Sequence, residues 1–147
     1  MTNIFSVVTD TATISIFDLQ AIRHRLADSP DWWSIVEDEI QEINNGNIIF
    51  LGVGDDGKYD VQITDEQERE SGVLNLNVPS GKVFVGAGED TTGGGLEPDG
   101  AASIQGRVIE LKPGPYQVMF KKVADLIIIS FRASTAVGNK LDQEVRI

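Results

Sequence analysis

The chain has 147 residues and carries 12 Lys and Arg against 23 Asp and Glu, a formal net charge of −11 at pH 7. Such an acidic surface repels nucleic acids and anionic membranes, and it accelerates encounter with basic proteins. The absence of cysteine excludes disulfides, thiol nucleophiles and cysteine-ligated zinc.

The length suits one domain over residues 1–147. The first ten residues have neither the basic region nor the apolar stretch of a secretory signal. The longest apolar run, residues 126–129, is far shorter than the roughly 20 residues of a membrane-spanning helix. We therefore expect a cytoplasmic protein that binds neither membranes nor nucleic acids.

The first third of the chain predicts a strand followed by a helical segment over residues 18–45. Ile14 and Ile16 alternate with polar neighbours, as in a short strand. Apolar residues at helical spacing predict two helical turns over residues 19–27, which Pro30 ends.

A second helix follows, and the Asn-Asn-Gly sequence at 44–46 stops it. Its predicted apolar stripe comprises Trp32, Val36, Ile40 and Ile43. The residues expected to face solvent are Glu37, Asp38, Gln41 and Glu42.

From residue 46 onward apolar residues recur at the spacing typical of β-strands rather than of helices. Residues 47–53 and 58–64 flank a Gly-Asp-Asp-Gly turn, which predicts a β-hairpin. Further strands are predicted at 73–78, 82–85, 107–111, 116–121 and 126–131, and the tail from 133 to 147 has room for one more. The nearly continuous apolar run at 126–131 indicates a central strand covered on both faces. The residues expected in the core are Leu76, Val85, Val118 and Ile128.

No long connecting helix is predicted after residue 45, which excludes parallel βαβ units there. The predicted fold class is α+β and mainly β: an antiparallel β-sandwich or partial barrel with one or two short N-terminal helices. Residues 86–102 are rich in Gly, Thr, Asp and Glu, and are expected to form the longest loop.

Motifs of enzyme chemistry are weak. Residues 52–57 match the pattern G-x-G-x-x-G, but the strand predicted after them cannot hold a pyrophosphate as a helix N-terminus does. His24 lies between two arginines and is interpreted as structural, although Asp18 or Asp28 could orient it as a base. No nucleophile accompanies it in a local motif. The sequence predicts no catalytic residue and no cofactor.

Acidic residues of the Gly-rich loop are candidate calcium ligands, because calcium is bound by six to eight oxygens. The candidates are Glu89, Asp90, Glu97 and Asp99. The spacing of an EF-hand is absent, so a solvated loop is the alternative interpretation.

Four segments appear in the order known from one family: TISIF at 13–17, the Asp31-Trp32 pair before an acidic helix, GNIIF at 46–50, and LKPGPYQV at 111–118. The arrangement resembles the competence protein J family, which inhibits a DNA-entry nuclease. The resemblance implies a short, acidic, strand-rich inhibitor. It transfers no inhibitory residue and leaves residues 86–102 unmatched. The sequence is also similar to uncharacterised short bacterial proteins.

Three hypotheses on function remain open. The first is a non-enzymatic acidic binding protein, an inhibitor or immunity-like protein for a basic nuclease or toxin. The second is an accessory subunit of an assembly, self-associating through strand edges. The third is a calcium-dependent or carboxylate hydrolase. The candidate partner contacts are Trp33, Glu37, Asp38, Glu42, Glu66, Glu68 and Glu70.

Overall fold

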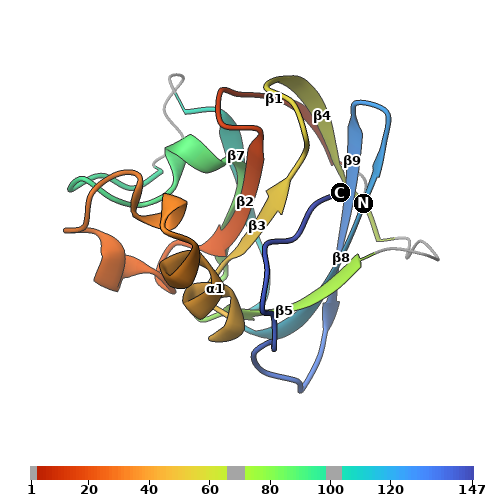
Figure 1. The fold of residues 1–147 in the computed structure, drawn as a ribbon. Coiled ribbons are helices and arrows are strands. Elements are labelled where there is room, and N and C mark those ends of the chain that lie inside the picture. Colours follow the sequence, from red (N-terminus) through yellow and green to blue (C-terminus); the bar gives the residue numbers. More distant parts are fainter. Residues whose placement is uncertain (1–2, 66–71, 99–103) are drawn as a thin grey trace.

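The computed structural model describes residues 3–65, 72–98 and 104–147. These residues form nine strands in two sheets, one α-helix and three short 3-10 helices (Figure 1). The fold is α+β and mainly β, as predicted, and within the described residues the sheets do not close into a barrel.

The larger sheet has the strand order β1-β4-β9-β8-β5. Its strands are β1 (Asn3–Thr9), β4 (Gly57–Ile63), β5 (Gly72–Val78), β8 (Gly114–Val123) and β9 (Leu126–Ala133). Neighbouring strands are antiparallel except β4 and β9, which are parallel. No helix-connected parallel unit occurs among the described residues after 45, because the connection from β4 to β9 runs through strands of both sheets.

The smaller sheet has the order β3-β2-β6-β7 and is antiparallel throughout. Its strands are β2 (Thr13–Asp18), β3 (Ile49–Gly52), β6 (Lys82–Ala87) and β7 (Gly106–Glu110). Every residue of β2 from Ile14 to Asp18 is buried, so both faces of this strand are covered. The larger sheet covers one face and the segment between β2 and β3 covers the other (Figure 1).

The predicted hairpin of residues 47–53 with 58–64 is wrong. Strand β3 pairs with β2, whereas β4 pairs with β1 and β9 in the other sheet. The turn at 54–57 therefore carries the chain from one sheet to the other, and Tyr59 Oη fastens it by donating to the Asp55 carbonyl oxygen at 2.6 Å. A turn sequence reverses the chain locally, but the choice of partner strand depends on distant residues.

The predicted helix at 19–27 is also wrong, because only η1 (Arg23–Arg25) forms there, as one 3-10 turn. A second 3-10 turn, η2 (Trp32–Ser34), precedes the helix α1 (Val36–Asn44). The helix is rotated relative to the predicted stripe: Glu39, Glu42 and Ile43 are buried, whereas Val36 is 43% exposed.

The Gly-rich loop is more structured than expected in its described part. Residues 86–87 end β6, η3 (Gly88–Asp90) follows, and Thr91 and Thr92 are buried. Trp32 Nε1 donates to the Thr92 carbonyl oxygen at 2.7 Å. Gly93 approaches the chain at Ser29 so closely that a Cβ atom would lie 3.0 Å from the Ser29 carbonyl oxygen. Residues 99–102 of the predicted loop lie outside the described residues.

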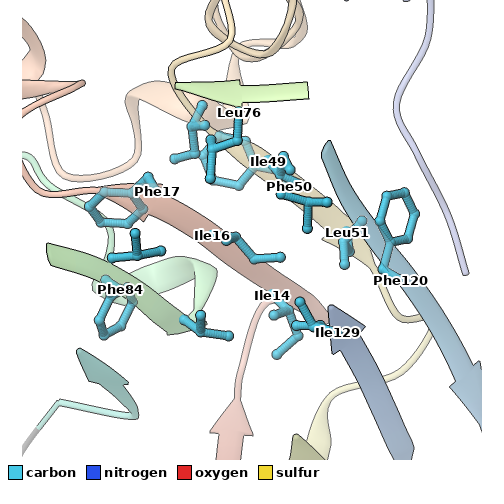
Figure 2. Packing of buried hydrophobic residues seen from close by; sticks show 14 of the residues in the cluster. Ile14, Ile16, Phe17, Ile49, Phe50, Leu51, Leu76, Phe84, Phe120 and Ile129 are labelled. Carbon is cyan, nitrogen blue, oxygen red and sulfur yellow. The ribbon is translucent and has the colours of Figure 1, made fainter. Parts of the chain in front are cut away.

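The buried side chains of both sheets form one cluster (Figure 2). Leu76, Val85 and Val118 belong to it, as predicted. Ile128 does not, because β9 alternates: Ile127 and Ile129 point into the core and Ile128 is only half-buried. The tail after β9 adds no strand within 134–147, but it runs back beside β3 and makes a single parallel bridge from Arg146 to Gly52 (Figure 1).

Candidate functional site

Acidic side chains gather on the segment that covers the smaller sheet. An open groove of about 540 Å³, called the acidic groove below, lies between η1, η2 and the start of α1. Its lining includes the carboxylates of Asp28, Asp31 and Asp38. Ile35 is 54% exposed at its edge, so the groove combines negative charge with an apolar contact point.

Arg25 is the cation of this groove, and its charge is already engaged. Its Nε donates to Glu42 Oε2 at 2.6 Å, and its Nη1 donates to Asp28 Oδ2 at 3.1 Å. Its Nη2 lies 3.6 Å from Asp38 Oδ1, and the guanidinium stands 4.8 Å from the centroid of the Trp32 ring. Arg25 therefore holds the groove together and offsets part of its charge, but three aspartates against one arginine leave the lining net negative.

Glu42 was expected to face solvent, and this prediction is wrong. The residue is 2% exposed and accepts hydrogen bonds from Arg25 at 2.6 Å and from Asn47 Nδ2 at 2.8 Å, with His24 Nε2 also 2.6 Å away. Burial raises the pKa of Glu42, but the hydrogen bonds from Asn47, Arg25 and His24 outweigh burial and hold its pKa below the usual range. Glu42 is thus a structural anchor for η1, and it explains the position of His24.

Asp18 and Asp28, the acids considered as partners of His24, have other roles. Asp18 is fully buried at the end of β2 and accepts hydrogen bonds from the backbone N–H groups of Ser80 at 3.0 Å and Gly81 at 2.9 Å. The Ser80 hydroxyl donates to it at 2.7 Å. Asp18 thereby fixes the turn between β5 and β6.

A second site lies where the tail meets α1, η2 and the β1–β2 turn. A cavity of about 240 Å³, called the carboxyl cavity below, is lined by Trp33, Glu39, Glu144 and Arg146, among others. Glu39 is 5% exposed, whereas Glu144 is exposed. Burial raises the pKa of Glu39 to about 8, and the charge and hydrogen bond of Glu144 add to the effect. The Glu39 carboxyl group therefore holds its proton near neutral pH.

Trp33 is half-buried in the wall of the carboxyl cavity. Its ring stacks on Phe50 with centroids 5.4 Å apart and 25° between the planes. Its Nε1 atom is buried and has no hydrogen-bond acceptor among the described residues. Trp33 is therefore a fixed aromatic wall rather than a mobile side chain on the surface.

The remaining sequence candidates for partner contact are distributed unevenly. Glu37 is exposed on the first turn of α1, and Asp38 beside it is partly engaged by Arg25. Glu66, Glu68 and Glu70 lie outside the described residues. Whether these acids contact a partner stays a prediction.

The calcium candidates do not form a metal-binding group in the described part of the chain. Glu89 accepts hydrogen bonds from the hydroxyls of Thr9 and Thr11, both at 2.8 Å, and from the Asp10 backbone N–H. Burial raises the pKa of Glu89, but these hydrogen bonds hold it below its usual range. Asp90 accepts from the Gln105 backbone N–H at 2.8 Å, and burial raises its pKa.

These two carboxylates fasten the β1–β2 turn and the start of β7. Within residues 3–65, 72–98 and 104–147, no group of three or more His, Asp or Glu is placed to hold a metal ion. Glu97 has one buried carboxylate oxygen without a described partner, and Asp99 lies outside the described residues.

Sequence reasoning missed Glu39, Glu144 and Arg146. Glu39 lies in an acidic run, and the buried face of that helix was predicted from its apolar residues alone. The tail shows no regular spacing of apolar residues, so the position of Glu144 could not be predicted. The one feature of the sequence that indicated this site was Trp33, which lies next to the predicted apolar stripe of the helix. As for membranes, none of the helices that the structure describes is long and apolar enough to cross one.

Comparison with known proteins places this geometry in context. The model of a family described as "Family of unknown function (DUF6386)" matches residues 1–147. Comparison with curated proteins gave no match.

Two solved structures are similar to the fold. One is ComJ of Bacillus subtilis, described as an inhibitor of the DNA-degrading activity of NucA, with a TM-score of 0.58 and 13% identity. The other is described as crocagin biosynthetic gene J, with a TM-score of 0.53 and 17% identity. Each alignment covers 90% of this chain and 96% of the other. The resemblance to the competence protein J family is thereby confirmed at the level of the fold.

Proposed function

The chain belongs to the family of unknown function DUF6386, and we propose that it is a non-enzymatic protein that binds and inhibits a basic protein such as a nuclease or toxin. The observation that carries this proposal is the acidic groove. It presents three aspartates around an arginine whose charge is already engaged, and it places the exposed Ile35 at the edge. The ComJ fold neighbour, an inhibitor of a nuclease, supports the same role, as does the net charge of −11.

The physical logic is that of steered association. A surface with one sign of charge accelerates the encounter with a basic partner, and packed apolar residues then slow dissociation. Ile35 and Val36, 54% and 43% exposed, are available for such packing beside Glu37 and Asp38. We place this activity in the cytoplasm, as the sequence predicts.

Self-association through strand edges is favoured less, because backbone donors at both outer edges of the larger sheet are occupied. On β1 the Val8 N–H donates to Gln105 Oε1 at 3.1 Å. On β5 the Asn75 N–H donates to Asn139 Oδ1 at 2.8 Å, and the Asn77 N–H donates to the Gly46 carbonyl oxygen at 2.8 Å. A strand added at either edge would have to displace these contacts.

The test is capture of a partner from a lysate of the source organism at about 0.15 M salt, where the Debye length is about 8 Å. We expect a basic protein whose association slows as salt rises and whose activity the captured complex lacks. Asp31→Lys should slow association, whereas Asp125→Lys, the same change of charge on the exposed β8–β9 turn, should not. The absence of a basic partner, or equal effects of both variants, would contradict the proposal.

A further inference from the structure

The carboxyl cavity has rigid walls built from segments far apart in the sequence. The tail forms one side, where the Gly52 N–H donates to the Val145 carbonyl oxygen and the Ile147 N–H donates to the Gly52 carbonyl oxygen, both at 2.9 Å. Trp33 forms another side, held by its stacking on Phe50. The volume of about 240 Å³ is below the roughly 300–1,000 Å³ of ordinary small-molecule sites, so the cavity suits a single side chain.

Glu39 in this cavity lacks the partners that buried acids normally have. It is 95% buried, yet no Lys, Arg or His of the described residues lies within 4 Å of its carboxylate, and the other carboxyl group in the lining is that of Glu144. Glu42, one turn later on the same helix, shows the usual arrangement with three nitrogen partners. A buried acid without a cation keeps its proton, whereas a cation beside it would stabilise the ionised form, so Glu39 is free to pair with a cation from outside the chain.

Trp33 provides a second and independent sign of a missing ligand. Its side chain lines the same cavity, and its Nε1–H is a buried donor that has no acceptor among the residues that the structure describes. The lining of the cavity thus includes the side chain that carries this donor and two carboxyl groups that no cation of the described residues accompanies. A simple cation would satisfy only the carboxyl groups, whereas an amino-acid residue carries both a side-chain cation and carbonyl oxygens.

We propose that the carboxyl cavity binds an arginine side chain of the basic partner, an inference that rests on the proposed inhibitory function. A planar guanidinium can meet two carboxyl groups through several N–H donors at once and can pack against an aromatic ring. A lysine ammonium has neither the fixed planar set of N–H donors nor a flat face that can pack against the ring. Calcium needs six to eight oxygens, and the cavity offers two carboxyl groups.

The charged side chains that line the cavity are Glu39 from α1 and Glu144 and Arg146 from the tail. Arg146 is exposed and makes no ion pair within 4 Å in the described structure, so it leaves both carboxyl groups available. The proton on Glu39 must leave when a guanidinium enters, because a cation favours the ionised carboxylate. Binding near neutral pH should therefore release a proton.

The experiment is a titration of the full chain, without any partner protein, using acetyl-arginine amide and its neutral isostere acetyl-citrulline amide. The readout is the indole N–H resonance of Trp33 by ¹⁵N NMR. Trp32 serves as the internal reference, because its Nε1–H is already bonded to Thr92. We expect the arginine probe to shift the Trp33 resonance and the citrulline probe to leave it unchanged.

Glu144→Gln and Glu39→Gln should each weaken the binding affinity for the arginine probe by about tenfold or more, and tenfold corresponds to about 1.4 kcal/mol. Asp142→Asn, the same loss of charge on an exposed residue of the tail, should have no effect. Glu144 is exposed, so its variant remains informative even if Glu39→Gln were poorly folded.

An unshifted Trp33 resonance, an equal shift with citrulline, or an equal loss in Asp142→Asn would overturn the inference. Because no partner is used, this result and the result of the capture experiment can differ. If a basic partner is captured but the arginine probe does not bind, the arginine site alone is refuted. If the probe binds but no basic partner is captured, the inhibitor role alone is refuted.

Discussion

Replacing Glu39 by Gln should change how the stability of the protein depends on pH. Burial and Glu144 raise the pKa of Glu39 in the folded chain to about 8, whereas in the unfolded chain it titrates near its ordinary value of 4.5. Between these values the folded state holds a proton that the unfolded state has lost. The folded state is therefore favoured at low pH, and this contribution is lost as pH rises from about 4.5 to about 8.

The magnitude follows from the two pKa values. At about 1.36 kcal/mol per pKa unit, the difference between 4.5 and about 8 corresponds to at most about 5 kcal/mol. Relaxation and water penetration lower the cost of a buried charge well below such a bound, so we expect about 2 kcal/mol. Gln is neutral at every pH and can donate to Glu144 as protonated Glu39 does, so the variant should lack this loss of stability.

The assay is urea unfolding of both proteins from about pH 4 to about pH 9. The free energy of unfolding of Glu39→Gln should equal that of the unsubstituted chain near pH 4 and exceed it by about 2 kcal/mol near pH 9. Glu37→Gln, on the exposed face of the same helix, should follow the unsubstituted pH profile. Parallel profiles for Glu39→Gln and the unsubstituted chain would refute a buried Glu39 that keeps its proton near neutral pH.

Two further predictions concern packing and a buried acid. Ile127→Ala should lower the free energy of unfolding by about 2–5 kcal/mol, measured by chemical denaturation. Replacing the half-buried Ile128 by Ala should lower it by clearly less. Equal losses would mean that β9 is oriented differently. Asp18→Ala should cost about 3 kcal/mol, because it leaves buried N–H groups of the β5–β6 turn without an acceptor, whereas Asp10→Ala on the exposed β1–β2 turn should cost less than 1 kcal/mol, about the range of surface substitutions. Similar melting temperatures for these two variants would contradict the role given to Asp18.

Strands were predictable where the apolar period was clean. Leu74, Leu76 and Val78 alternate with polar residues, and the structure places a strand there with these three residues buried. The sheet to which each strand belongs was not predictable, because an Asp-Gly turn looks the same whether the next strand pairs with the previous one or crosses to another sheet. Strand β1 went unrecognised because Ile4 and Val8, on its exposed face, mask the alternation of Phe5 and Val7.

The candidate site was less predictable than the fold, and Glu42 shows why. Its charge and its place in an acidic helix indicate an exposed residue, and only the arrival of Arg25 and Asn47 from outside the helix makes its burial possible. Glu39 and Glu144 are 105 residues apart in the sequence, counted as 144 minus 39, and no local pattern connects them. Trp33 was recognisable as a candidate because large aromatic side chains stand out in any sequence.

The parallel pairing of β4 with β9 determines when the larger sheet can be completed during synthesis. After residue 63 has left the ribosome, β4 can pair with β1, but its other edge has no partner until β9 ends at residue 133. The smaller sheet is complete earlier, with residue 110. A nascent chain between these lengths therefore carries an unpaired edge on β4, the state in which strands of neighbouring chains associate wrongly. The time for which this edge stays unpaired is set by the translation speed across residues 64–133.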